Sequence, residues 1–255
     1  MDSQLQQQLA EHNRWWLQAL LFLPQAQQPA TGWLWLLLDD MLQTALLPTQ
    51  SSNARLNLSW WQEQLRQPGD SGHPGLRTLK TQRPDLPAHP AWPHWFDACQ
   101  QLLNQPAEQA LTLCHKAWQQ LEAALADHPH PPCEPTAAIL ACEQALAQQR
   151  NRVRFGLPGH SALAALPPRI WQQPAATGPE WQQADTLLRH LAARALELNT
   201  AAHLPAATAL RLWLARQRLR QWQIQGLNAY NGLRLSPWRS LLGFWLTARR
   251  HRSRQ

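Results

Sequence analysis

The chain contains very few of the residues that β-sheets favour. Valine occurs once in 255 residues, at Val153, and isoleucine occurs three times. Sheets are enriched in β-branched side chains, whereas the leucine and alanine that dominate the apolar fraction here are good helix formers. A chain of this length can also bury a substantial core. The sequence therefore predicts an all-α fold.

Glycine is also scarce, with 10 residues, whereas proline is frequent, with 21. The prolines cluster between segments whose apolar residues repeat at helical spacing, and they end helices there. The helices predicted in this way cover 4–23, 31–47, 53–67, 92–104, 107–126, 136–150, 180–200, 205–225 and 236–250. We expect 70–91 to be poorly defined and 151–178 to be irregular, with one short helical turn. No repeat or linker divides the chain, so we predict one domain over 1–255 with a basic tail at 249–255.

Two of these helices, 31–47 and 107–126, are apolar on more than one face. Such helices lie inside a bundle rather than on its surface. A bundle with central helices is the kind of fold that can enclose an apolar ligand cavity.

Charged residues make up only 15% of the chain, and just two of the 23 basic residues are lysines. Arginine is favoured where planar, bidentate contacts with phosphate or carboxylate are needed. The net charge is +7, but the basic residues are dispersed and no nucleic-acid-reading motif is present. We therefore predict no nucleic-acid partner.

The four cysteines form no C-x-x-C pair, and no apolar run is long enough to cross a bilayer. The first residues are acidic and polar, unlike the start of a signal peptide. We expect a cytoplasmic protein with free thiols, and peripheral contact with the inner membrane stays open. His128, His130 and Cys133 are zinc-ligand types, but the prolines among them hinder convergence on one ion. Their role stays open.

Asp39 and Asp40 come directly after the apolar run 33–38. Carboxylates in such a position are costly when buried without a partner, but they suit Mg²⁺, which takes carboxylates together with substrate phosphate oxygens. The alternative is a solvated helix turn that faces a basic residue. Asp97 lies in another aromatic-rich helix, where a metal ligand and a hydrogen-bonded surface aspartate are both open.

Two further clusters carry positive charge. The first, beside a predicted helix end, has arginines at alternate positions, Arg150, Arg152 and Arg154. They could hold a diphosphate through charge-assisted hydrogen bonds. The alternative is a solvated basic loop. The last helix combines aromatic bulk with arginines, a combination that suits an anionic membrane surface, an acidic partner, or core packing with a solvated basic end. Its candidate contact residues are Trp238, Arg239, Arg249, Arg250 and Arg252.

Several blocks of the sequence, taken in order, resemble the squalene/phytoene synthase family. Residues 39–43 read DDMLQ, like the family's first aspartate-rich motif, and 54–65 read ARLNLSWWQEQL, like its R/K-L-x-W-W-R-E-x-L helix. His73 and Pro74 then match its His-Pro pair. Weaker matches extend the resemblance over about 15–250 and lie at Asp97, 108–126, 203–205, 210–220 and 235–239.

The resemblance implies an isoprenoid-synthase-type helical bundle around a central cavity. Active members hold Mg²⁺ between two facing D-x-x-x-D motifs, and the metal draws off the diphosphate of a prenyl donor. Here Gln43 closes the first motif in place of an acid, and Pro93 stands four residues before Asp97. A neutral amide does not offset the charge of a dication. The chain is therefore similar to non-catalytic relatives such as a mitochondrial respiratory complex I assembly factor.

Three functional hypotheses follow. The leading one is a catalytically degenerate squalene/phytoene synthase-like protein that binds a prenyl diphosphate or an isoprenoid lipid, or assists assembly of a membrane complex. The second is an active prenyltransferase that holds Mg²⁺ on Asp39, Asp40 and Asp97 and diphosphate on the arginines at 150–154. The third is a helical adaptor that docks its basic C-terminus on a membrane or an acidic protein.

Overall fold

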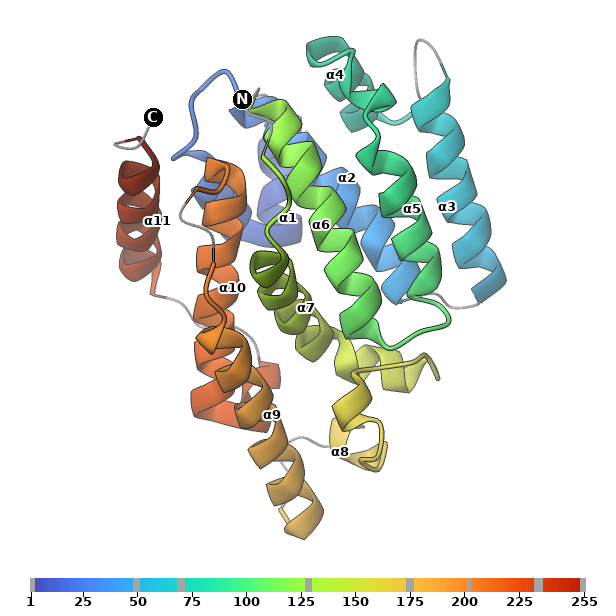
Figure 1. The fold of residues 1–255 in the computed structure, drawn as a ribbon, viewed down its shortest axis with the longest axis vertical. Coiled ribbons are helices and arrows are strands. Elements are labelled where there is room, and N and C mark those ends of the chain that lie inside the picture. Colours follow the sequence, from blue (N-terminus) through green and yellow to red (C-terminus); the bar gives the residue numbers. More distant parts are fainter. Residues whose placement is uncertain are drawn as a thin grey trace.

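Segments that combine helical periodicity with a proline at one end form the helices of this protein (Figure 1). The computed structural model describes residues 3–47, 51–67, 72–126, 130–172, 177–200, 203–231 and 236–252. Its α-helices are α1 (Ser3–Leu20), α2 (Gln28–Leu46), α3 (Ser51–Arg66), α4 (Pro74–Gln82), α5 (Ala91–Gln101), α6 (Ala107–Leu125), α7 (Glu134–Arg154), α8 (Arg169–Gln172), α9 (Pro179–Glu197), α10 (Ala206–Gln225) and α11 (Pro237–Arg252). Short 3₁₀ helices are η1 (Leu86–Ala88), η2 (Ser161–Leu163) and η3 (Gly226–Asn231). No strand occurs among the described residues, so the prediction of an all-α fold is confirmed.

Proline marks the start of most of these helices, because its fixed φ suits the first turn and its missing N–H is not needed there. A proline occupies one of the first two positions of α2, α4, α7 and α9. The residue just before α5, α6 and α10 is also a proline. Helix positions could therefore be predicted from the proline positions.

Two local predictions were wrong. The helix α4 forms within 70–91, because Leu76 and Leu79 lie one turn apart and both are buried where α4 packs on α2. The helix α7 continues to Arg154 instead of ending at 150, and its last turn is held by the buried side chain of Arg152. The arginine cluster consequently lies on a helix rather than in a loop.

Two apolar cores share α7 and α10. The first joins α1, α2, α5 and α6 with parts of α3, α4 and α11, and the second joins α7, α8, α9 and α10. The helix α7 contributes Ala141 and Ala145 to the first core and Ile139 and Leu146 to the second. A helix with apolar residues on opposite faces has to lie in the interior. Both shared helices run through the middle of the molecule, with α3 at one edge and α11 at the other (Figure 1).

The helices α2 and α6 are buried along most of their length, as their apolar faces predict. Asp39 is the one carboxylate among the buried residues of α2. None of the helices in the described part of the chain is both long enough and apolar enough to cross a membrane.

The helix α1 is kinked at Asn13, where the backbone leaves helical geometry (φ −155°, ψ 91°). The Asn13 side-chain oxygen accepts a hydrogen bond from the backbone N–H of Trp15 at 3.2 Å. Asparagine side chains make such local bonds readily, and these bonds compete with the helix. At the kink, His12 and Asn13 line a pocket, while Trp15 and Trp16 enter the core.

Candidate functional site

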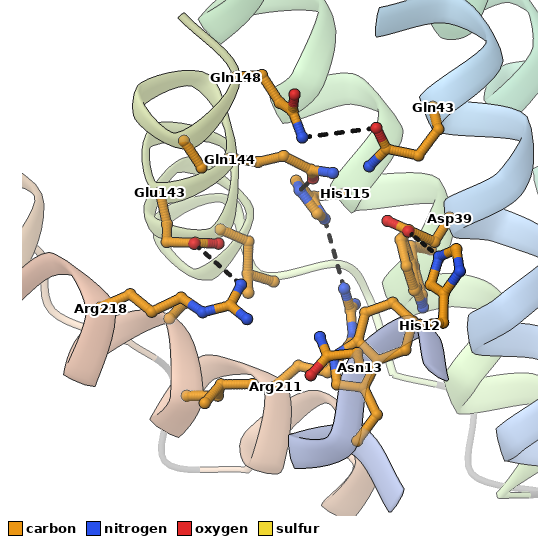
Figure 2. A pocket seen from close by; sticks show the side chains of 16 residues that line it. His12, Asn13, Asp39, Gln43, His115, Glu143, Gln144, Gln148, Arg211 and Arg218 are labelled. Carbon is orange, nitrogen blue, oxygen red and sulfur yellow. Dashed lines mark hydrogen bonds and ion pairs between the residues drawn. The ribbon is translucent and has the colours of Figure 1, made fainter. Parts of the chain in front are cut away.

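A pocket of about 280 Å³ lies where α1, α2, α6, α7 and α10 meet, between the two apolar cores. Trp16, Trp118, Leu140 and Leu214 form part of its apolar lining. Polar groups from all five helices point into the same space (Figure 2). They belong to His12, Asn13, Asp39, Gln43, His115, Glu143, Gln144, Gln148, Arg211 and Arg218.

We call the ion pair between Arg211, which lines the pocket, and Glu122 of α6 the inner end of the site, because the Glu122 side chain is fully buried and is not itself part of the lining. Its carboxylate accepts hydrogen bonds from Arg211 Nε at 2.8 Å and Arg211 Nη2 at 3.1 Å. It also accepts hydrogen bonds from Trp35 Nε1 at 2.6 Å and Thr208 Oγ1 at 2.5 Å. A buried charge is tolerated when it is paired and fully hydrogen-bonded. This ion pair therefore ties α6 to α2 and α10.

His115 extends the same network across the pocket to α7. Arg211 Nη1 lies 3.5 Å from His115 Nδ1, and because a guanidinium only donates, Nδ1 is the acceptor. Nε2 then carries the proton and donates to Gln144 Oε1 at 2.9 Å. Burial, with the nearby Arg211 charge, lowers the pKa of His115 to about 3. The imidazole is therefore neutral at physiological pH.

The mouth of the pocket holds a second, more exposed charged pair. His12 Nε2 lies 2.6 Å from Asp39 Oδ2 and 3.9 Å from Asp40 Oδ1. The hydrogen bond to Asp39 raises the pKa of His12, whereas burial raises the pKa of Asp40. The His12 side chain is 32% exposed and that of Asp39 is 13% exposed. Asp39 thus has a basic partner within the chain.

Two pairs of side chains face each other between α2 and α7, each pair spaced four residues apart. Asp39 and Gln43 line the pocket from α2, and Gln144 and Gln148 line it from α7. Gln148 Nε2 donates to Gln43 Oε1 across the gap at 3.5 Å, as Figure 2 shows. Residues four apart share a helix face, so each helix presents its pair together. Only one of these four side chains is a carboxylate.

The residues around this pocket do not fit a magnesium cluster. Besides Asp39, the other lining carboxylate is Glu143, which accepts a hydrogen bond from Arg218 Nη1 at 3.1 Å. Both lining carboxylates are therefore already bonded to a basic side chain of the protein. Among the described residues, no three or more histidine, cysteine, aspartate or glutamate side chains are grouped so as to hold a metal ion. His128 of the zinc-ligand candidates lies outside the described residues.

The structure does not bring Asp97 together with Asp39 and Asp40. Trp95, Phe96 and Cys99 occupy the buried side of α5, so Asp97 falls on its exposed side and does not line the pocket. The side chains that face Asp39 and Gln43 across the pocket are instead those of Gln144 and Gln148 of α7. The sequence did not point to these two glutamines, because a neutral amide is not an expected ligand for Mg²⁺ and only acidic residues were considered as ligands.

The three candidate arginines lie in different surroundings. Arg152 is buried, and it donates to the carbonyl oxygens of Leu102, at 2.6 Å, and of Pro158. Burial lowers the pKa of Arg152 to about 10. Arg150 and Arg154 are exposed and lie outside the pocket lining. Arg152 therefore holds the end of α7 against the loop before α6, and its Nε and Nη2 atoms are occupied by backbone carbonyls.

Apart from Asp39, the charged residues that build the site were not singled out in the sequence. Glu122 and Arg211 each have leucine or alanine neighbours in a long helix, at positions that are buried in the core. A charge at a core position needs a buried partner of opposite charge. The positions of Glu122 and Arg211 could therefore have predicted that they pair. His12 and Arg218 carried no comparable pattern.

Trp238, Arg239, Arg249 and Arg250 are exposed on α11, away from the pocket. The side chain of Arg252 lies outside the described part. Comparison of the chain with protein-family models, with curated protein sequences and with solved structures gave no match. The chemistry of the pocket and of the surface is therefore the basis for the functional proposals.

Proposed function

We propose that this chain is a squalene/phytoene synthase-like protein of the isoprenoid-synthase bundle type that has lost its metal chemistry. It binds the polar head of an isoprenoid lipid in the pocket, without magnesium. The observation that carries this proposal is the pair of facing i, i+4 positions on α2 and α7, which hold Asp39, Gln43, Gln144 and Gln148. The placement suits two opposed metal-binding motifs, but three of the four side chains are neutral amides.

Loss of these acids removes the electrostatic basis for ionising a prenyl diphosphate. Magnesium assists such chemistry by neutralising the leaving phosphate, and it needs anionic ligands to hold it there. Asp39 is bonded to His12, and Glu143 is bonded to Arg218. A metal ion would have to displace both basic partners, which makes binding unfavourable.

The charge balance of the pocket favours a neutral head group over a diphosphate. Arg211 and Arg218 are its arginines, and both are already bonded to carboxylates, Glu122 and Glu143. The other polar groups of the lining are mostly the amides of Gln43, Gln144 and Gln148. Each amide both donates and accepts, so it can form further hydrogen bonds beyond the one already described. A hydroxyl or carbonyl head matches such groups well.

The size of the pocket sets a second limit. Its volume of about 280 Å³ lies just below the roughly 300–1,000 Å³ that is usual for small-molecule sites. The pocket therefore accommodates a head group with the start of its chain, and it does not enclose a long apolar tail. An isoprenoid alcohol or quinone suits it better than a prenyl diphosphate.

Calorimetric titration with farnesol tests this proposal. We expect saturable binding to the wild type and a clear loss of affinity in Gln148→Leu, because this change removes an amide from the pocket wall. The matched control is Gln183→Leu, which changes an exposed glutamine on α9 outside the pocket. Unchanged farnesol binding by Gln148→Leu would contradict the proposal.

The alternative of an active prenyltransferase is tested with the same protein. Incubation with farnesyl diphosphate and Mg²⁺ should release no diphosphate above the rate without protein. Release that is lost in Asp39→Asn would establish the active enzyme and refute the loss of metal chemistry.

A further inference from the structure

The last helix turns its apolar side toward solvent. Trp238 is 81% exposed, Leu242 is 57%, Trp245 is 44% and Leu246 is 41%. Their spacing of four, three and one residues places all of them on one face of α11. Large apolar side chains gathered in this way mark an interaction site more often than single exposed ones do.

The inward side of the same helix is mostly small. Ser240, Phe244 and Ala248 are buried at i, i+4 spacing, and the Ser240 hydroxyl donates to the Ser236 carbonyl oxygen at 3.0 Å. Phe244 packs on Trp213 of α10, with ring centroids 4.7 Å apart. The helix therefore buries one aromatic ring and leaves two indoles outside.

Close packing fixes this orientation. A side-chain carbon added at Gly243 would lie 2.0 Å from Cζ2 of Trp213, so α11 and α10 approach more closely than any larger residue permits. Rotating the helix to bury its tryptophans would break this contact and expose Phe244. The outward position of the apolar face is thus part of the packed structure.

Charge on the exposed face is of one sign. No aspartate or glutamate occurs in 236–252, whereas Arg239 and Arg249 are exposed beside the apolar residues. The Arg249 guanidinium lies 5.2 Å from the centre of the Trp245 ring. The helix forms one edge of the bundle (Figure 1), and the exposed side chains run from Trp238 to Arg249 along it.

We propose that the outer face of α11 docks on an anionic lipid surface, lying parallel to it. Tryptophan rings partition to the boundary between head groups and acyl chains, and leucines beside them add buried apolar area. Arginines at the same level are attracted by anionic lipids. The proposal commits to lipid because the indoles and arginines share one exposed helix edge that carries no acid. It does not depend on the pocket holding a ligand.

Co-sedimentation with vesicles of phosphatidylcholine containing phosphatidylglycerol tests the apolar part. The double variant Trp238→Gln/Leu242→Gln should weaken vesicle binding by about tenfold or more, because two large side chains no longer enter the interface. Both positions are exposed, so the fold should be kept, and circular dichroism checks this.

The chain supplies a matched control at the opposite edge of the bundle. Leu56 and Trp60 on α3 are also four residues apart, with exposures of 69% and 47%. The variant Leu56→Gln/Trp60→Gln should bind vesicles as the wild type does. An equal loss in both double variants would show general hydrophobic adsorption and overturn the assignment to α11.

The charge on the face is tested separately. The variant Arg239→Gln/Arg249→Gln should weaken binding to the anionic vesicles by about fivefold per arginine, and the effect should fade at high salt. Binding to vesicles of phosphatidylcholine alone should be weaker and should not respond to this variant. Failure of the wild type to bind anionic vesicles, or equal binding to both kinds of vesicle, would overturn the proposal.

Discussion

The inner end of the pocket and its mouth hold similar charged pairs in different surroundings. At the inner end, Glu122 and Arg211 have side-chain exposures of 0% and 5%, and the carboxylate has four hydrogen bonds. At the mouth, the His12 side chain is 32% exposed, whereas Asp39 is largely buried at 13%. Burial makes the first pair essential to the packing of three helices. The exposure of His12 means that breaking the second pair costs less stability and that a ligand can reach it.

Breaking the inner pair should have the largest effect. Glu122→Gln keeps the shape of the side chain but leaves Arg211 buried without its counter-charge, which typically costs about 3–5 kcal/mol of unfolding free energy. Urea denaturation measures this loss. The control is Glu143→Gln, whose partner Arg218 is 28% exposed and can reach water. Similar losses of unfolding free energy in the two variants would show that the inner pair contributes no more to stability than the pair of Glu143 and Arg218.

The second-largest effect should be a loss of folding stability in acid, through His115 beside the inner pair. The folded-state pKa of His115 is lowered to about 3, so the unfolded chain binds a proton near its ordinary pKa of about 6.5 while the folded chain does not. Stability therefore falls as pH drops below this ordinary value, by roughly 2 kcal/mol by pH 5 from this group alone.

His115→Gln should remove that part of the pH dependence, because glutamine has no proton to gain. Denaturation curves of wild type and variant at several pH values give the comparison. If the two slopes agree between about pH 6.5 and 5, His115 is not the buried neutral group described above.

Breaking the pair of His12 and Asp39 at the mouth should have the smallest effect on stability. Its histidine has a raised pKa, so the pair with Asp39 stabilises the folded chain below the ordinary pKa of about 6.5 and loses this contribution as pH rises through the raised value. Asp39 is largely buried but its partner His12 can reach water, so Asp39→Asn should change stability by less than Glu122→Gln does. The same variant should lower the pKa of His12, which NMR titration of its ring protons measures. A pKa that does not move would contradict the contact.

The sequence was informative about helices and less so about which residues meet. Prolines and apolar periodicity located α2 and α6 well, because both signals are local. The helix α4 was missed because its buried face is only two leucines long. Asp39 was found because an acid after an apolar run is a local anomaly.

Pairing in the pocket could not be predicted in the same way. Asp39 meets a histidine 27 residues away, and Arg211 meets a glutamate 89 residues away. Such contacts depend on how helices are rotated against one another, which their sequences do not state. Asp97 could not be placed from the sequence for the same reason. The packing of the aromatic residues of α5 decides that Asp97 points to solvent and away from Asp39 and Asp40.

Calorimetric titration with Mg²⁺ distinguishes a pocket that has lost its metal site from one that keeps it. The wild type should show no saturable binding, whereas Gln43→Asp/Gln148→Asp should bind the ion, because it places two further carboxylates opposite each other beside Asp39. Saturable binding by the wild type that disappears in Asp39→Asn would contradict the loss of metal chemistry and restore the enzyme hypothesis.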